Sequence, residues 1–363
     1  MTDTSTKLYQ SIHAQPEAVR MLLADEEGIS SAAERLSQSG RIFLAGIGTS
    51  FHAAIVGEYL LRVTGADAWA VRSFEFVNYP RPLRSDDSVI LISHRGSKQY
   101  SVQAIERANA AKTFTLGITG KGSKMQGADA VLETVAQDPS SAHSISYTGT
   151  LTRLAQIAAH MAALQGRTDV TQRLTYELER IPFLMEAILR REDEVRIVAQ
   201  EAVAQRRRIY FIGAGPNAAT APEGALKAKE SAYVTAEGFE LEQALHGPLV
   251  SFESTDLVIP LCVTGAAQRR MADLLLALSE IDAHVWLVGE APNAETAALF
   301  PTPHRSSLTL TSGENMLEEL TPLLAALPVQ LLANFLAGAR GTNADSFRLE
   351  HEPYQRANAR FRL

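Results

Sequence analysis

The sequence repeats itself at long range. The segment RIFLAGIGTSFHAA (residues 41–54) resembles RIYFIGAGPNAATA (residues 208–221), so that Arg208 lies 167 positions after Arg41. The similarity continues at nearly the same offset in two further pairs of apolar runs: DSVILIS (87–93) with DLVIPLCV (256–263), and TFTLGIT (113–119) with HVWLVG (284–289). A repeat of this length indicates a duplicated domain and not a solenoid of short units.

Apolar runs alternate with helical patterns in each half. Short Val/Ile/Leu runs are separated by amphipathic stretches such as residues 99–111 and 266–280. This alternation is typical of a parallel sheet covered on both faces. We therefore predict an α/β protein with two tandem doubly wound parallel-sheet domains. The predicted parts are a helical extension at residues 1–30, a first domain at 31–166, a helical linker at 167–197, a second domain at 198–340 and a tail at 341–363.

Composition narrows the class of protein. The chain has 363 residues, 46% of them hydrophobic and 21% charged, which suits a soluble globular protein of two domains. The net charge of −7 is spread along the chain, so we expect no nucleic-acid partner. The polar N-terminus has no apolar signal core, which favours a cytoplasmic location.

Two further features exclude other classes. The one cysteine, Cys262, lies in an apolar run, so it forms no internal disulfide and no Cys–His metal cluster. We expect neither a metal nor a cofactor. The longest apolar stretch, residues 320–339, contains two prolines, Gln330 and Asn334, and therefore predicts a buried helix and no membrane partner.

Hydroxyl, glycine and basic residues gather after two strands of the first half. Glycine lets the backbone approach an anion, and helix-start amides with hydroxyls donate to it. These turns predict a monophosphate site made by Gly48, Thr49, Ser50, Ser93, Arg95, Ser97 and Lys98. The alternative is a pair of ordinary strand–helix turns with hydroxyl caps. The second half has CVTGAAQ (262–268) at the matching place, with fewer donors, so we place the phosphate in the first half only.

A dinucleotide site is a weaker interpretation of the second glycine-rich turn. GAGPNA (213–218) satisfies G-x-G-x-x-A after a strand, but such a site needs an acidic residue at the end of the next strand. We interpret residues 227–242 as a helix followed by a loop, which misplaces Glu230 and Glu237 for a ribose contact. The first copy has Phe51 at the third glycine position.

One predicted helix carries charged residues on a single face. Pro222 suits its first position, and Glu223, Lys227 and Glu230 follow at i, i+4 and i+7 spacing. We expect this face to open at the edge where the strands end. An exposed Glu–Lys pair without function is the alternative.

A histidine follows this helix in the loop ALHGPL. Gly247 and Pro248 restrict the loop around His246, which makes that histidine a candidate acid or base. The alternative is a histidine with a purely structural role.

These residues carry a family resemblance. The segments GIGTS, LISHRGS, PEGALKAKES, EGFELEQALHGPL and PVQLLANFLAGARGTNAD resemble the sugar isomerase (SIS) family. The likeness is to the isomerase half of glucosamine-6-phosphate synthase and to free-standing phosphosugar isomerases, deaminases and deglycases. It covers nearly the whole chain and implies a homodimer of doubly wound domains, with the site at the dimer interface.

The resemblance also implies roles for single residues. Thr49, Ser50, Ser93 and the loop through Lys98 would bind the phosphate of a sugar-phosphate substrate. Glu230 would be the base that moves a proton between C1 and C2, and His246, supplied by the partner subunit, the acid that opens the ring. Glu223 and Lys227 would hold the open chain and tune the base.

The sequence departs from the family pattern in three places. The usual S-x-S-G-x-T loop is SHRGSK here, with Arg95 and Lys98 in place of hydroxyl residues. The synthase has a lysine near its C-terminus, whereas residues 345–363 contain none, so we expect no imine to such a lysine. No glutamine-hydrolysing domain precedes the module, so we do not expect the full synthase reaction.

The sequence thus predicts a phosphosugar isomerase, or an amino-sugar-phosphate deaminase or deglycase. It would open a hexose or amino-sugar 6-phosphate and transfer a proton between C1 and C2. The missing lysine favours amine release. The alternative is a non-catalytic module that senses a sugar phosphate.

Overall fold

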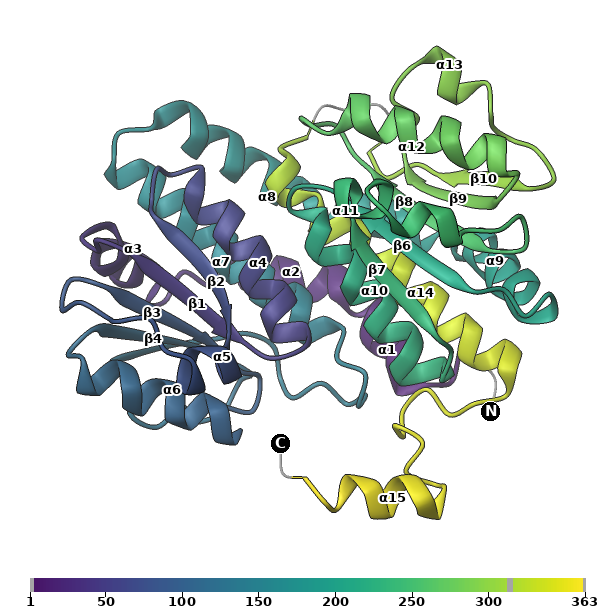
Figure 1. Cartoon of the computed structure of the whole chain (residues 1–363). Helices are drawn as coiled ribbons and strands as arrows, with labels where there is room; N and C mark the ends of the chain where they lie inside the picture. The colour runs from purple at the N-terminus through teal and green to yellow at the C-terminus, as the bar shows by residue number, and fades with distance from the viewer. Residues whose placement is uncertain (1–2, 312–315, 362–363) are drawn as a thin grey trace. The chain divides into compact units, whose positions relative to one another are not determined.

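The computed structural model describes residues 3–311 and 316–361, and the chain divides into two compact units (Figure 1). The first unit comprises Ala14–Pro139, His143–Pro182 and Arg348–Leu363. The second comprises Met1–His13, Ser140–Ala142 and Phe183–Phe347. Helix α8 (Thr168–Leu189) passes from the first unit to the second at Pro182.

The first unit is built on a parallel five-stranded sheet of order β2-β1-β3-β4-β5. Its strands are β1 (Ile42–Gly46), β2 (Ala68–Arg72), β3 (Ser88–Ile92), β4 (Phe114–Thr119) and β5 (Ala130–Glu133). Its helices are α2 (Gln15–Leu23), α3 (Ile29–Ser37), α4 (Thr49–Arg62), α5 (Ser73–Asn78), α6 (Gln99–Ala110), α7 (Ile145–Leu164) and α15 (Glu352–Asn358).

The second unit repeats this sheet, with the order β10-β9-β8-β6-β7 and all pairs parallel. Its strands are β6 (Ile209–Gly213), β7 (Ala236–Glu240), β8 (Leu257–Cys262), β9 (His284–Gly289) and β10 (Arg305–Leu308). Its helices are α1 (Lys7–His13), α9 (Glu192–Ala204), α10 (Asn217–Ala232), α11 (Leu241–Leu245), α12 (Gln268–Ile281), α13 (Ala294–Ala297) and α14 (Pro322–Arg340), with two 3₁₀ turns, η1 (Pro248–Ser251) and η2 (Glu318–Leu320).

The predicted fold class is confirmed, since each sheet is parallel and carries helices on both faces. The six apolar runs of the repeat form the strands β1, β3, β4, β6, β8 and β9. One interpretation was wrong: residues 227–242 contain the strand β7 after the helix. This strand lies at the edge of its sheet and is only partly buried, so it lacks the apolar run that marks a central strand.

The two cores repeat one packing contact. Leu44 of β1 meets Gly57 of α4, where an added Cβ would lie 2.6 Å from its side chain. Phe211 of β6 meets Gly224 of α10 in the same way, at 2.8 Å. A larger residue at either glycine would push the helix off the sheet, so the duplication preserved the glycine while the strand residue changed size.

A bidentate ion pair supports the start of each sheet. Arg41 donates to both carboxylate oxygens of Asp87 at 2.8 and 2.6 Å, and Arg208 donates to those of Asp256 at 2.7 and 2.8 Å. Burial alone would raise the pKa of Asp87, but the Arg41 guanidinium and the Arg84 amide hold it below its usual range. Each pair joins the residue before the first strand of its repeat to the residue before the third strand.

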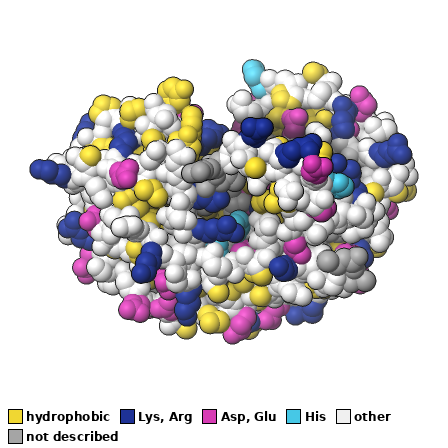
Figure 2. Space-filling model, turned by 90° about the horizontal axis from the view of Figure 1, so that it is seen from below, with side chains coloured by type: hydrophobic (Ala, Val, Ile, Leu, Met, Phe, Trp, Pro, Cys, Tyr) yellow, Lys and Arg dark blue, Asp and Glu magenta, His cyan; other side chains and the backbone are white. Residues whose placement is uncertain are grey.

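The apolar stretch near the C-terminus forms α14, a buried helix as predicted. Among the described residues, Glu318–Arg340 is the one helical stretch long and apolar enough to cross a membrane, and its apolar window is wholly buried inside the protein. On the face of the molecule in Figure 2, basic and acidic side chains are interspersed.

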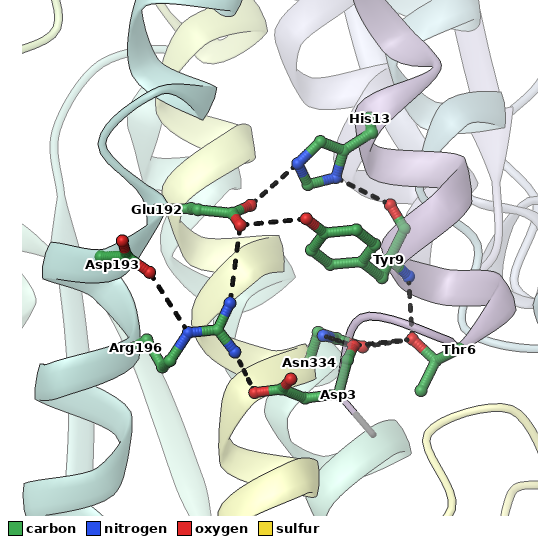
Figure 3. A network of polar contacts seen from close by, with 8 residues as sticks. All are labelled: Asp3, Thr6, Tyr9, His13, Glu192, Asp193, Arg196 and Asn334. Atoms are coloured by element: carbon green, nitrogen blue, oxygen red, sulfur yellow. Dashed lines mark hydrogen bonds and ion pairs between the residues drawn. The ribbon is translucent and has the colours of Figure 1, made fainter. Parts of the chain in front are cut away.

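A polar network attaches α1 to the rest of the second unit (Figure 3). The Tyr9 hydroxyl donates to Glu192 Oε1 at 2.9 Å, and His13 Nε2 lies 2.8 Å from Glu192 Oε2. Arg196 pairs with both Glu192 and Asp3. Burial and the Glu192 carboxylate raise the pKa of Tyr9 to about 12.

This network predicts a pH-dependent loss of stability in Tyr9→Phe. At neutral pH the variant should lose about 1.5 kcal/mol of unfolding free energy, as expected for a hydrogen bond to a charged group. Because the folded pKa of Tyr9 lies above the usual 10.0, the bond contributes fully below pH 10 and is lost as the pH rises through 12. Urea unfolding of both proteins across this range measures the difference. Tyr176→Phe, at an exposed tyrosine, is the control and should change nothing.

Candidate functional site

The loops predicted to bind phosphate follow two neighbouring strands of the first unit. Strands β1 and β3 pair side by side, with Ala45 opposite Leu91. Strand β2 lies on the outer side of β1, so the chain order reverses between β1 and β3. In doubly wound sheets, ligands bind at this reversal, beyond the ends of the strands.

The turn after β1 brings the start of α4 close to the strand. Gly48 has φ of 55° and ψ of −127°, which a residue with a side chain rarely adopts. At Gly46 an added Cβ would lie 2.3 Å from the Ser50 carbonyl oxygen. Thr49 and Ser50 then begin α4 and are partly exposed. The turn therefore presents two hydroxyls at a helix N-terminus, as the sequence predicted.

The loop after β3 combines a buried hydroxyl with two cationic side chains. Ser93 is 5% exposed, Arg95 and Ser97 are exposed, and Lys98 is half-buried before the first residue of α6. Burial lowers the pKa of Lys98, and the charge of Arg95 lowers it further. Neither cation forms an ion pair with any residue that the structure describes, so an anion between them would relieve their repulsion.

Sequence reasoning missed His94, which fixes the shape of this loop. Its carbonyl oxygen accepts from the Gly120 amide at 2.9 Å and from the side chains of Thr119, Ser123 and Gln137 at 3.1–3.2 Å. Thr119 is the last residue of β4, Gly120 and Ser123 lie in the loop after β4, and Gln137 lies in the loop after β5. The carbonyl of one residue thus joins three neighbouring loops at the edge where the strands end.

The His94 ring makes a second connection. Its Nε2 accepts from the Asp138 amide at 2.9 Å, so the proton of the neutral ring sits on Nδ1. Burial lowers the pKa of His94, Asp138 opposes this, and Arg95 adds to it. The ring packs against Gly120, where an added Cβ would lie 2.5 Å from Cε1. His143 stacks edge-on at 5.3 Å between centroids and is partly exposed, which makes it a further candidate for contact with a bound molecule.

The charged helix face lies on α10 in the second unit, and its three residues are in contact. Lys227 Nζ lies 2.6 Å from Glu230 Oε2 and 3.5 Å from Glu223 Oε1. The side chains of Glu223 and Lys227 are 0% and 1% exposed, and that of Glu230 is 23% exposed. The interpretation as an exposed Glu–Lys pair is therefore wrong. Only Glu230 presents its carboxylate outward.

Two expectations about this helix were wrong. It begins at Asn217, after Pro216, so Pro222 lies inside it. Pro222 packs closely against β7, where an added Cβ on Gly238 would be 2.4 Å from the proline nitrogen. No side chain can enter that space.

The second error concerns where the charged face opens. The helix starts at the edge where β6 ends and runs back along the sheet, and β7 then begins opposite the start of β6. Glu230, in the last turn, therefore lies about 20 Å along the helix from Asn217, toward the opposite edge. Polar residues after α14 reach the same end: Thr342 donates to the Ser231 carbonyl at 3.0 Å, and Tyr233 to that of Asn343 at 2.8 Å.

His246 is exposed and forms the C-cap of α11, where its amide donates to the Glu242 carbonyl at 2.9 Å. The Gly247 that follows has φ of 151° and leads into η1. His246 lies in the loop after β7, whereas Glu223, Lys227 and Glu230 lie on α10. Its role stays a prediction.

The strand β7 bears on whether the glycine-rich turn at residues 213–218 could bind a dinucleotide. It ends in Glu240. A ribose-binding acid would lie at this place, the end of the strand that follows the glycine-rich turn and its helix. However, the Glu240 carboxylate accepts from the amides of Glu242 and Gln243 and so caps α11. This local use accounts for the acidic residue without a cofactor. Among the described residues, no group of three or more His, Cys, Asp or Glu is arranged to hold a metal ion.

The sequence model of the SIS domain matches residues 35–165 and 202–288, which include the loops after β1 and β3 and the helix α10. The chain belongs to the SIS domain family. It is 30% identical over 352 residues to glutamine–fructose-6-phosphate aminotransferase (isomerizing) of Gloeobacter violaceus, a match that covers 93% of this chain and 56% of that protein. The SIS chain thus spans little more than half the length of this curated relative.

Solved SIS-like structures share the fold. The C-terminal domain of glucosamine-fructose-6-phosphate aminotransferase from Francisella tularensis has a TM-score of 0.84 at 20% identity, covering 94% of this chain and 98% of that one. Tagatose-6-phosphate ketose/aldose isomerase from Escherichia coli has a TM-score of 0.80 at 22% identity, covering 96% of each chain.

The contact between His94 and Gly120 predicts a coupled pair of substitutions. Gly120→Ala should destabilise the protein and weaken binding of inorganic phosphate roughly tenfold, because the new methyl displaces the His94 ring and with it the phosphate loop. In a His94→Ala background the same substitution should cost less, since the ring is absent and the flexible end of Gln137, 2.8 Å from the new methyl, can move aside. Thermal unfolding and phosphate titration measure the coupling.

A conservative variant separates positioning from packing. His94→Gln keeps a side-chain acceptor for the Asp138 amide and should retain more phosphate affinity than His94→Leu at similar stability. If Gly120→Ala costs as much phosphate affinity and stability in the His94→Ala background as in the native protein, this role for His94 is contradicted.

The buried charges on α10 predict a strong effect of Lys227→Met. The variant would leave the fully buried Glu223 carboxylate and Glu230 without their cation, and should lose about 3–5 kcal/mol of unfolding free energy. Lys229 lies two residues further along the same helix and is exposed. Lys229→Met is therefore the matched control, and its stability should stay within about 0.5 kcal/mol of that of the native protein. Urea unfolding decides, and equal stabilities of the two variants would show that Lys227 is not needed for the fold.

Proposed function

We propose that this SIS protein is an enzyme that converts a hexose or amino-sugar 6-phosphate by opening the ring and moving a proton between C1 and C2. The family match and the 30% identity to a fructose-6-phosphate aminotransferase support a role in sugar-phosphate chemistry. The proposal assigns phosphate binding to the first unit and proton transfer to the second.

The observation that carries the proposal is the ordered row Glu223, Lys227 and Glu230. A base that removes a proton next to a carbonyl must be accessible, and of the three only Glu230 has appreciable exposure. The enediol or enolamine formed by this step carries negative charge on oxygen, which a nearby fixed cation stabilises. Lys227 is such a cation, and the buried Glu223 fixes its position from the other side.

The phosphate would bind where β1 and β3 end. Helix-start amides with Thr49, Ser50, Ser93 and Ser97 supply donors, as in other anion sites at helix N-termini. Arg95 and Lys98 add charge that hydroxyl side chains would not supply, and the charge of Arg95 acts on Lys98. The substrate would therefore be bound as the phosphate dianion.

His246 would act as the acid that opens the ring. Its exposure fits a side chain that completes its site with a second copy of the chain, so we propose a homodimer. An imidazole side chain can donate a proton to the ring oxygen as a general acid.

The reaction outcome is aldose–ketose isomerisation or release of an amine at C1 or C2. No lysine follows Lys229 in the sequence, so within this chain no later lysine can form an imine with the sugar. A substrate that brings its own nitrogen can still form the enolamine. We therefore propose amine release from an amino-sugar phosphate as the first activity to test.

The test offers glucosamine 6-phosphate, fructosamine 6-phosphates and fructose 6-phosphate to the protein, and measures free ammonia or amine and the interconverted sugars. Turnover is expected with at least one of them. In Glu230→Gln the amide oxygen can still accept from Lys227, so the fold should persist while kcat falls about 10²–10⁴-fold, the usual contribution of a general base.

Glu237→Gln is the matched control, because Glu237 is an exposed carboxylate on β7. It should leave kcat unchanged. Undiminished kcat in Glu230→Gln would remove Glu230 from the mechanism, and phosphosugar binding without turnover of any substrate would favour the sensing alternative.

A further inference from the structure

A cavity of about 290 Å³ lies in the second unit, at the edge of the sheet where the strands begin. It is bordered by α9, by the first residues of β9 and by the turn that leads into β10. Its apolar part includes Ile197, Val198 and Leu257. Two arginines and two histidines supply most of its polar part: Arg207, His284, His304 and Arg305. An apolar hollow with a few converging polar groups is the usual form of a site for a small organic molecule.

The turn before β10 holds two of these side chains in place. Thr302 and Arg305 exchange backbone hydrogen bonds at 2.9 and 3.1 Å, and the His304 carbonyl accepts from the Val285 amide at 2.9 Å. The rings of His284 and His304 lie 4.3 Å apart between centroids. The polar side of the cavity is therefore built on hydrogen-bonded backbone.

The charges around His284 are mainly positive. Burial lowers the pKa of His284, and the cationic side chains around it lower it further, to about 4. These side chains are Arg207, His304 and Arg305, and the charge of Asp282 opposes them. The ring is therefore neutral at pH 7 and lies where another positive charge is unfavourable. The same surroundings attract a negative charge.

One of the arginines has a donor that the protein leaves unused. Arg305 donates to Asp282 Oδ1 at 3.2 Å through Nη2, but its Nε is buried and has no acceptor among the described residues. Arg207 donates to the Thr255 carbonyl at 2.9 Å through Nη1, and burial lowers its pKa. A buried donor without an acceptor costs free energy, and an anion in the cavity would supply the acceptor.

Two glutamates of α9 also border the cavity. Glu194 accepts from Nε and Nη2 of Arg191 at 2.8 Å, so its charge is offset by a neighbour. Glu201 is exposed and acts on the partly buried Arg207. Because solvent and salt screen exposed charges most strongly, these carboxylates leave the inner part of the cavity positive.

The first unit shows that the fold does not require a histidine here. The first residue of β4 is Phe114, and the first residue of the matching strand β9 is His284. Arg35 of α3 stacks on Phe114, with Cζ 5.0 Å from the ring centroid. An apolar ring thus fills in one unit the position that an imidazole fills in the other. Packing of the sheet therefore does not explain the polar group.

We propose that this cavity binds a small organic oxyanion, a carboxylate or a phosphate monoester. The oxyanion would accept from Arg207, Arg305 and the neutral ring of His284, and its organic part would lie against Ile197 and Val198. The described residues that border the cavity include none of those assigned to ring opening and proton transfer, so the site is separate from the proposed reaction.

The experiment adds benzoate, phenyl phosphate, benzyl alcohol or inorganic phosphate to the full chain at pH 7. It follows the ring signal of His284 by NMR, which His284→Gln assigns. Benzoate, phenyl phosphate or both should shift this signal until it saturates, and the tighter of the two identifies the head group. Benzyl alcohol, which has the ring without the charge, should bind at least about tenfold more weakly.

Variants test the charge. Arg305→Gln should weaken binding of the organic anions roughly tenfold, because the amide can still donate to Asp282 but carries no charge. Arg269→Gln, at an exposed arginine of α12, is the matched control and should leave binding unchanged. If Arg305→Gln does not fold, Arg207→Gln gives the same test.

Two further variants test the apolar wall and the independence of the site. Ile197→Ala, at a residue that is 55% exposed, should weaken the organic anions about threefold but not inorganic phosphate. Ser93→Ala should leave the His284 shifts unchanged, so failure of the predicted phosphate loop and failure of this site are distinguishable. The proposal is overturned if neither organic anion shifts the His284 signal, if benzyl alcohol or inorganic phosphate binds as tightly, or if the arginine variants bind as the native protein does.

Discussion

All strands of each sheet run parallel, so every strand ends at the same edge. The loops that follow neighbouring strands therefore lie together at that edge. The helices that run back along the sheet end at the opposite edge. The loops after β1 and β3 meet at one edge of the first sheet, and the carbonyl of His94 joins the latter to the loops after β4 and β5. In the second unit the same constraint sends Glu230 to the far end of α10, away from the turn that begins the helix.

Burial decides what the row of charges on α10 can do. Two carboxylates lie within 3.5 Å of the Lys227 ammonium, which is 1% exposed, and they offset the cost of burying its charge; the inner one, Glu223, is as deeply buried as the lysine. The outer carboxylate is therefore held by a cation that cannot move toward solvent. Such an arrangement combines a fixed positive charge with one accessible carboxylate, which a pair of flexible surface side chains would not achieve.

The sequence predicted the central strands, because β3, β4, β8 and β9 are buried on both faces and show as apolar runs. It also predicted that Glu223, Lys227 and Glu230 share a helix face, which follows from helical spacing alone. Edge strands such as β7 were missed. Because such a strand is only partly buried, its sequence contains no continuous apolar run. The role of His94 was also missed, because its partners come from loops 25 to 44 residues away and no local pattern records them.

The duplication shows which features a doubly wound unit must keep and which it can change. The two copies share the Arg–Asp pair before the strands, the helix glycine against the sheet and the turn with a left-handed glycine. They differ in what lies beyond the strands: hydroxyls and two cations in the first unit, and the Glu318 carboxylate in the second. The shared features hold the backbone of the sheet in both copies. Loop side chains contribute little to that backbone, so the same turn can begin a helix with two hydroxyls in one copy and face the Glu318 carboxylate in the other.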